Sequence, residues 1–465
     1  MSILPAAGVT FPAEVPVLIV GGGAAGLVAA LAARDAGADV VVLERDPVPR
    51  GSTALSSGLV PAAGTKAQKA RGIKDTAERF AADIQKKARS QADQKLVETM
   101  ARASGPTIDW LSQAHGVPFS LVEGFLYPGH SVLRMHATPR RTGAELMDVL
   151  RDAATRAGAQ IVASARVNAI YADEQRRIAG VRVERPDGKT ENIGAVALVL
   201  ACSGFGGNPE MVRKFIPEMA NALFFGHAGN QGEGISWGTA LGATVRHMGA
   251  YQGHASVATP HNILITWALM MEGGIQVNAE GRRFLNETHG YSEQSVVVLQ
   301  QPGSVAWNIY DERRHKLGLE FEDYRNAIEA GAINIAPDIA TLAAALGLPA
   351  DALIHTIDET RLYAGGLATD PFGRDFRGKP PLESPFCGVK VTGALLHTQG
   401  GLVVDRSACV CQANGAPLPN LFAAGGTACG VSGPAVWGYL SGNGLLSAVT
   451  LGRIAGTAAA ELATD

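Results

Sequence analysis

The stretch "PVLIVGGGAAGLVAALAARDAGADVVVLERD", residues 16–46, decides the fold. Residues 17–20 form a continuous apolar run, which is typical of a strand buried in a parallel sheet. Gly21, Gly23 and Gly26 then make G-x-G-x-x-G at the start of a small-residue helix, and a second apolar run ends at Glu44. The order strand, tight turn, helix, strand predicts a dinucleotide-binding unit.

Each glycine has its own task in such a unit. The first permits the turn, the second lets a pyrophosphate approach the backbone, and the third lets helix and strand pack closely. The free N–H groups and the dipole at the helix N-terminus favour the phosphates. Glu44 follows Gly26 by 18 residues, at the end of the second strand, where an acid can bond ribose hydroxyls.

Small-residue loops elsewhere indicate a cofactor with a second half. "RGSTALSSGLVPAAG" (50–64) follows Glu44 closely and offers hydroxyls and exposed backbone. "LPNLFAAGGTACGVSG" (418–433) predicts a strand that enters another glycine turn. "GYLSGNGLLSAVTLGRIAGTAAAEL" (438–462) predicts a glycine-rich loop that leads into a long helix.

This layout resembles the fumarate reductase and succinate dehydrogenase flavoprotein family. The resemblance is carried by "VGGGAAGLVAA", "GSTALSSGL", "NQGEGISW", "VNAEGRRFLNE", "LHTQGGLVVD", "LFAAGG" and "SGNGLLSAVTLGRIAG", which occur in family order over nearly the whole chain. It implies an α/β fold: a two-dinucleotide-binding-fold FAD domain with an inserted α+β capping domain. The FAD domain would comprise residues 1–253 and 383–465, and the capping domain residues 254–382.

The resemblance implies FAD as the cofactor. The branch of the family that attaches FAD covalently uses a histidine in the serine-rich loop, and residues 50–60 contain none, so we expect non-covalent FAD. The residues expected to bind it are Gly21, Gly23, Ala24, Ala25, Gly26, Glu44, Arg45, Ser52, Thr53, Ser56, Ser57, Gly58, Val167, Ala201, Gly204, Asn230, Glu233, His397, Gly425, Gly426, Gly442, Asn443, Gly444 and Leu445.

The rest of the chain follows simple patterns. Residues 145–163 predict a helix that runs into a strand, and residues 166–200 an antiparallel hairpin with Asp187-Gly188 as its turn. Helical periods recur at 310–331 and 338–365.

Composition excludes several classes of protein. The chain has 465 residues, 46% hydrophobic and 18% charged, which indicates a globular protein of two domains. A net charge of −3 without a basic stripe disfavours nucleic acid as a partner. Five cysteines without CxxC spacing predict free thiols in a cytoplasmic protein and no metal site. The apolar stretch 17–33 is short of a membrane span and interrupted by glycines, so we expect no integral membrane segment.

Two tyrosines stand where fumarate reductases carry arginines. In that family an arginine after "G-[KR]-R-F-x-N-E" protonates the substrate, and the gap-free count places Tyr291 there. A second arginine, which binds a substrate carboxylate, corresponds to Tyr439 when counted back from "TLGRIAG". A dicarboxylate needs cationic partners to offset its desolvation, and phenols do not supply them.

Paired phenols suit a ketone. This pattern resembles the 3-ketosteroid dehydrogenases and the related cyclic-ketone desaturases. It implies that Tyr291, made more acidic than the usual pKa of about 10, takes the α-proton while the β-hydrogen leaves as hydride to the flavin. Tyr439 would hold the carbonyl, with Ser441 and the amide of Gly442 as helpers. Tyr127 lies where ketosteroid enzymes can place a third tyrosine; packing is its alternative role.

The sequence leaves the roles of several further histidines and of one arginine open. His397, in "LHTQGG", matches a family histidine that touches substrate or flavin. His254 and His261, with Arg134 and His136, line the mouth of the site or lie on the surface.

The leading hypothesis is thus an FAD-dependent dehydrogenase that desaturates a cyclic ketone and passes its electrons to a quinone, an electron-transfer protein or O₂. The alternatives are an enoate or fumarate-type reductase and a flavoprotein subunit of an electron-transfer complex. An NADPH-dependent monooxygenase is disfavoured because no second nucleotide fingerprint occurs.

Overall fold

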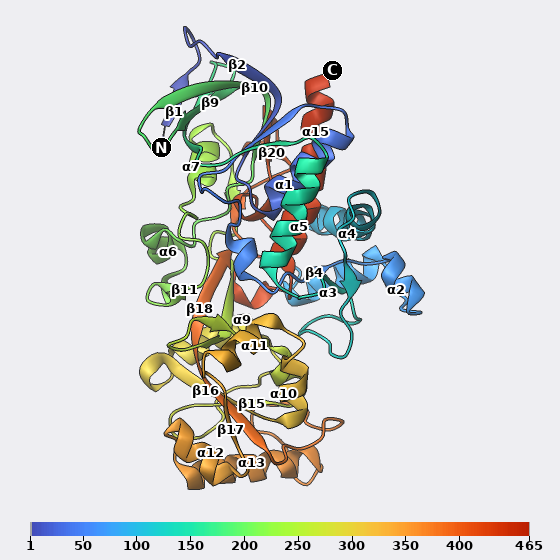
Figure 1. The fold of residues 1–465 in the computed structure, drawn as a ribbon, viewed down its shortest axis with the longest axis vertical. Coiled ribbons are helices and arrows are strands. Elements are labelled where there is room, and N and C mark those ends of the chain that lie inside the picture. Colours follow the sequence, from blue (N-terminus) through green and yellow to red (C-terminus); the bar gives the residue numbers. More distant parts are fainter. Residues whose placement is uncertain (1, 465) are drawn as a thin grey trace.

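The computed structural model describes residues 2–464, which form two stacked bodies (Figure 1). The larger body holds both chain ends, and the smaller one holds most of residues 254–382. Their arrangement is that of the α/β fold with an inserted α+β domain.

The larger body is built on a sheet of nine strands whose centre is parallel. β10 (Thr190–Leu200) lies between β2 (Ala13–Val20) and β21 (Pro417–Ala423), and β2 pairs in turn with β3 (Val40–Leu43). The four apolar residues at the end of β2 are almost fully buried, as the continuous apolar run predicted. β7 (Gln160–Val162) completes the parallel part.

Helix α1 (Ala24–Asp35) packs against the C-terminal helix α15 (Gly452–Thr464). The two backbones approach so closely that a Cβ at Gly456 would lie 2.1 Å from the carbonyl oxygen of Ala29. This is why both helices consist largely of Ala and Gly. Residues 443–464 are one helical run that is long and apolar enough to cross a membrane, but 61% of its most apolar 18-residue stretch is buried inside the protein. A helix buried to this extent is typical of the core of a folded domain.

Two predicted stretches of the larger body have the expected form. α5 (Gly143–Arg156) runs into β7, and β8 (Arg166–Ala172), β9 (Ile178–Glu184) and β10 are antiparallel neighbours. Gly188 has a φ of +81° in the turn between β9 and β10, a value that favours glycine. α3 (Ala77–Lys87) and α4 (Gln94–Ala114) cover the side of this body.

The smaller body has a sheet of seven strands around β18 (Phe386–Thr398). Each of the two stretches predicted to be helical, residues 310–331 and 338–365, forms two consecutive helices. In the first stretch, residues 310–311 still belong to a strand, and the helices follow it. Gly347, with a φ of +69°, and Pro349 break the second period. The further elements are β11 (Leu223–Phe224), β13 (Tyr251–Ala258), β14 (Ile263–Leu264), β15 (Ile275–Val277), β16 (Val305–Asp311), β17 (Asn334–Ala336), α9 (Tyr291–Leu299), α10 (Glu312–Gly318), α11 (Glu322–Glu329), α12 (Ile339–Leu346) and α13 (Ala350–Ala364).

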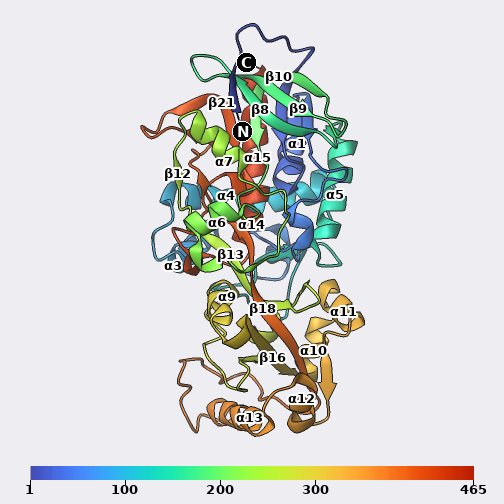
Figure 2. The same ribbon diagram turned by 90° about the vertical axis from the view of Figure 1, so that its left-hand side faces the viewer.

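Two strands connect the bodies. β13 and β18 pair from Tyr251 with Thr398 to Ala258 with Val391, and β18 runs from one body into the other (Figure 2). The expected boundary at residues 253–254 falls inside β13, and the boundary at 382–383 precedes β18.

Candidate active site

Two cavities adjoin at the carboxyl ends of the parallel strands, where ligands bind in open α/β sheets. We call the first the nucleotide trough; it holds about 850 Å³ of empty space. The second, the aromatic cavity, holds about 1030 Å³ and lies between the two bodies. Because the walls share Ser52, Thr53, Ser203, Gly426 and Ala448, the two cavities form one elongated site.

The trough has the features of a pyrophosphate site at the N-terminus of α1. No side chain caps this helix, so its first N–H groups remain available to an anion. Gly21 has a φ of +107°, and a Cβ there would lie 2.5 Å from the carbonyl oxygen of Ala201. A Cβ at Gly23 would meet nothing within 4 Å, so this backbone faces open space.

Glu44 lines the trough with its carboxylate held by backbone amides. Gly22 donates to Oε2 at 2.8 Å and Asp46 donates to Oε1 at 2.9 Å. Burial raises the pKa of Glu44, and these two amides offset part of the rise. A fixed acid at this place can bond ribose hydroxyls.

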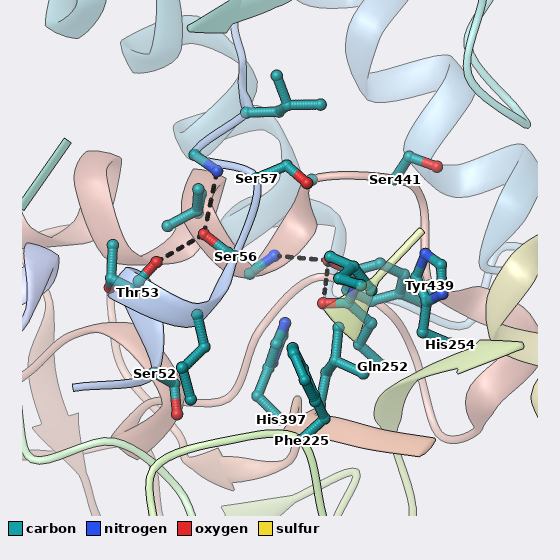
Figure 3. A pocket seen from close by; sticks show the side chains of 18 of the residues that line it. Ser52, Thr53, Ser56, Ser57, Phe225, Gln252, His254, His397, Tyr439 and Ser441 are labelled. Atoms are coloured by element: carbon teal, nitrogen blue, oxygen red, sulfur yellow. Dashed lines mark hydrogen bonds between the residues drawn. The ribbon is translucent and has the colours of Figure 1, made fainter. Parts of the chain in front are cut away.

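The serine-rich loop is fixed where the two cavities meet. Ser52 Oγ accepts hydrogen bonds from the amide of His227 and from Nδ2 of Asn230, at 2.9 and 2.7 Å. Ser56 Oγ donates to the carbonyl of Thr53 at 2.7 Å and accepts from the amide of Gly58 at 3.1 Å (Figure 3). The loop therefore turns its backbone and small side chains toward the elongated site.

Most residues expected to bind the cofactor line one of the two cavities, and three do not. Gly26 packs against the turn that follows β2, since a Cβ there would lie 1.9 Å from the carbonyl oxygen of Gly21. Gly204 packs against Thr398, and Asn443 is buried and donates to Ser432 Oγ at 3.1 Å. The lining set comprises Gly21, Gly23, Ala24, Ala25, Glu44, Arg45, Ser52, Thr53, Ser56, Ser57, Gly58, Val167, Ala201, Asn230, Glu233, His397, Gly425, Gly426, Gly442, Gly444 and Leu445.

Three tyrosines meet in the aromatic cavity, and we call Tyr127, Tyr291 and Tyr439 the tyrosine cluster. All three are at least nine-tenths buried. The ring centroids of Tyr291 and Tyr439 are 6.2 Å apart, and His254 stacks on Tyr291 at 4.6 Å. Ser441 lines the same cavity.

A buried ionic cluster fixes the segment that carries Tyr291. Arg283 donates to both carboxylate oxygens of Glu287, at 2.9 and 2.8 Å, and to Asp370 at 2.5 Å. Arg374 donates to Glu287 at 2.9 Å. The main-chain carbonyl of Glu287 accepts from Trp267 Nε1 at 3.1 Å. The motif "RRFLNE" therefore anchors the chain so that α9 begins with Tyr291 in the cavity.

Tyr439 is held by two neighbours (Figure 3). Its hydroxyl donates to Gln252 Oε1 at 2.9 Å and accepts from the amide of Gly444 at 3.4 Å. Sequence reasoning missed Gln252, because it lies on β13 outside every motif and 187 residues before Tyr439. Thr266 and Trp267, also in the wall, were missed because they too lie outside every motif.

The expectation that a tyrosine of the site is more acidic than usual was wrong for this state of the protein. Burial raises the pKa of Tyr291 well above 10, the neighbouring Tyr439 adds to the rise, and Ser441 offsets part of it. Burial also raises the pKa of Tyr127 to about 12 and that of Tyr439 further. All three phenols are protonated at neutral pH.

The described residues that line the aromatic cavity include no Lys, Arg, Asp or Glu. Burial lowers the pKa of His254 to about 3 and that of His397 to about 4, so both imidazoles are neutral. His254 lies in the wall, whereas His261 is exposed elsewhere. The wall is therefore uncharged at neutral pH, with its polar groups set among apolar side chains.

Arg134 and His136 lie neither at the mouth nor on the surface, which corrects the sequence-based expectation. Both are buried behind the wall, and Arg134 binds Asp75 and Asp83. Among residues 2–464 no group of three or more His, Cys, Asp or Glu has a metal-binding arrangement. The five cysteines are free.

Comparison with known proteins agrees with this geometry. Residues 16–445 match the family model described as FAD binding domain. A probable fumarate reductase of Shewanella frigidimarina is 31% identical over 97% of this chain and 75% of its own length.

Two solved structures are similar over nearly the whole chain. The open conformation of a flavocytochrome c3 fumarate reductase has a TM-score of 0.81 at 31% identity, covering 99% of this chain and 80% of its own. A 3-ketosteroid-Δ4-(5α)-dehydrogenase of Rhodococcus jostii with bound 4-androstene-3,17-dione has a TM-score of 0.76 at 26% identity, covering 99% of this chain and all of its own. The chain belongs to the FAD-binding domain family within the fumarate reductase and succinate dehydrogenase flavoprotein superfamily, and it is an FAD-dependent oxidoreductase.

Proposed function

We propose that this protein is a dehydrogenase that desaturates a cyclic ketone between its α and β carbons. The observation that carries the proposal is the uncharged wall of the aromatic cavity, in which three protonated tyrosines converge. A dicarboxylate buried here would find no cation, and an unpaired buried charge costs several kcal/mol, about 3 or more. A ketone requires only hydrogen-bond donors.

The residues divide the proposed reaction between them. Tyr439, with Ser441 and the amide of Gly442, would donate hydrogen bonds to the carbonyl oxygen and stabilise the negative charge that grows there on enolisation. Tyr291 would accept the α-proton in its phenolate form, after its own proton has passed to solvent, and Tyr127 would support the cluster. FAD, when bound, supplies the two-electron oxidant that takes the β-hydrogen as hydride. One C=C bond forms as the two C–H bonds break.

In the state described, Tyr439 donates to Gln252, so its proton must turn from Oε1 to the substrate oxygen. The amide of Gly444 would continue to donate to Tyr439 and favour that turn. Gln252 would therefore hold the hydroxyl in place until a ketone arrives.

A second function is favoured by one observation. The raised pKa of Tyr291 makes it a proton donor at neutral pH, which suits the reduction of an uncharged enone by an external electron donor. The same residues would serve, with the proton and hydride moving in the opposite sense. One relative is also named a probable fumarate reductase.

An anaerobic titration tests both functions. The purified, oxidised holoprotein is mixed with a 3-ketosteroid, cyclohexanone, 4-oxocyclohexanecarboxylate or succinate, and the flavin absorbance is followed. We expect bleaching by a ketone and none by succinate. Reoxidation of pre-reduced protein by an enone but not by fumarate would identify the reductase. Bleaching by succinate alone would refute both proposals.

The remaining assignments belong to the same proposal. FAD would be bound non-covalently, so acid precipitation should release all flavin into the supernatant. Electrons would pass to a quinone, an electron-transfer protein or O₂. A cytoplasmic location fits the five free thiols.

A further inference from the structure

A second buried ionic cluster lies behind the carbonyl end of the aromatic cavity. Arg134 is fully buried and donates to Asp75 at 3.0 and 2.9 Å and to Asp83 at 2.5 Å. Its guanidinium also lies over the ring of Phe80, 4.5 Å from the centroid. The cluster makes no contact with the cavity itself. A histidine, His130, connects this cluster to a loop that lines the cavity.

His130 connects Arg134 to the loop that carries Tyr439 and Ser441. Arg134 Nη1 lies 3.2 Å from His130 Nδ1, and His130 Nε2 lies 2.9 Å from the carbonyl oxygen of Ser441. A guanidinium can only donate and a carbonyl can only accept. The proton of the imidazole is therefore on Nε2, and the ring is neutral. Burial and the adjacent Arg134 agree, because they lower the pKa of His130 to about 4.

The peptide group that receives this hydrogen bond belongs to the site. Its carbonyl is that of Ser441, and its N–H is that of Gly442, which lowers the pKa of Tyr439 together with the amide of Gly444. Gly442 has a φ of +85°, and a Cβ there would lie 2.6 Å from Pro61 Cδ, so the peptide has little room to turn. Gly129 packs as closely on Leu440.

We infer that His130 is a positioning residue: its Nε2–H orients and polarises the Ser441–Gly442 peptide, so that Gly442 N–H and Tyr439 stabilise negative charge on the substrate oxygen. Arg134, which also binds Asp75 and Asp83, is the cation at the head of this chain of hydrogen bonds, and the described wall of the aromatic cavity itself has no cation. Hydrogen bonds in series strengthen one another in a low-dielectric interior. The inference rests on the proposed function for the identity of the substrate oxygen.

The test compares binding of phenol and 4-nitrophenol to the oxidised holoprotein by calorimetry. At a pH between their two pKa values, phenol is neutral and 4-nitrophenol is an anion with its charge on oxygen, like an enolate. For His130→Leu we expect phenolate affinity to fall roughly tenfold, as for the loss of one charge-directed hydrogen bond, and phenol affinity to change less than about twofold. The value of kcat should fall by a similar factor with KM unchanged.

Two variants separate orientation from packing. His130→Gln keeps an N–H donor near the Ser441 carbonyl and should restore phenolate affinity to within about threefold. His136→Gln is the matched control: His136 is also buried beside Arg134 and bonds its carbonyl at 2.9 Å, but it faces Thr65 and not the cavity. It should lower the thermal midpoint and leave the ratio of the two affinities unchanged.

Three outcomes would overturn the inference: an unchanged affinity ratio in folded His130→Leu, no rescue by Gln, or an equal loss in His136→Gln. If His130→Leu does not give folded holoprotein, His130→Asn replaces it, because the shorter amide does not reach the carbonyl. The phenol titration is independent of turnover. If no ketone bleaches the flavin but the affinity ratio changes, the proposed function fails and the role of His130 stands.

Discussion

Replacing Tyr291 with Phe removes one hydroxyl and leaves the shape of the aromatic cavity intact. The ring stacks on His254 at 4.6 Å and contacts Trp267 edge-on at 6.3 Å, and a phenylalanine ring keeps both contacts. Flavin content and ketone affinity should therefore stay within about twofold of the parent protein. The rate of flavin reduction should fall by roughly 10²- to 10⁴-fold, the contribution of a positioned acid or base.

Anaerobic stopped-flow at saturating ketone measures that rate directly, before any electron acceptor is involved. Tyr251→Phe is the matched control, because Tyr251 is a fully buried tyrosine that lies outside the wall of the cavity. It should reduce its flavin as fast as the parent protein. A rate for Tyr291→Phe within threefold of the parent, with flavin fully bound, would refute the assignment of Tyr291 as the base.

Further changes have defined results. Tyr439→Phe should lower kcat/KM for the ketone by about 10²- to 10³-fold, the effect of one oxyanion donor, as steady-state kinetics would reveal. Because the pKa of Tyr291 is raised, the rate of flavin reduction should still increase between pH 7 and pH 9, whereas a plateau below pH 8 would contradict its role as base. Burial alone would raise the pKa of Glu287, but Arg374 and Arg283 hold it at about 2, below its usual 4.5. This stabilisation is complete above pH 4.5 and is lost as the pH falls toward 2, so urea titrations should show a loss of about 3 kcal/mol over that window. Glu44→Ala should lose FAD on gel filtration while the helix content of the apoprotein is retained.

The sequence predicted the parts of the fold and site that depend on local pattern. The glycine spacing after β2 and the acid that follows β3 locate the nucleotide trough, because the first strand, turn and helix are consecutive in the chain. Tyr291 and Tyr439 could be placed by counting from "RRFLNE" and "TLGRIAG" without gaps. Both then line the same cavity, although 148 residues separate them.

The parts that could not be predicted depend on contacts between distant segments. Arg134 stands alone in its loop, and its partners Asp75 and Asp83 precede it by 59 and 51 residues. Nothing local distinguishes a buried, neutralised arginine from one that meets a substrate. The prediction that Tyr291 has a lowered pKa was wrong for the same reason, because desolvation depends on neighbours from several elements. Gln252 likewise reaches Tyr439 from a strand 187 residues earlier in the chain.

The distribution of charge explains why phenols and not guanidinium groups face the aromatic cavity, although buried arginines lie nearby. Arg283 and Arg374 neutralise Glu287 and Asp370 in one buried cluster, and Arg134 is paired with both Asp75 and Asp83 in another. Both clusters lie beside the aromatic cavity, and neither points a cation into it. Guanidinium groups thus hold the backbone rigid, while hydroxyls and amides meet the substrate. An oxygen that carries only partial charge during enolisation can be stabilised by such groups without a resident counterion, whereas a dianion would bring two full charges to a wall that offers none.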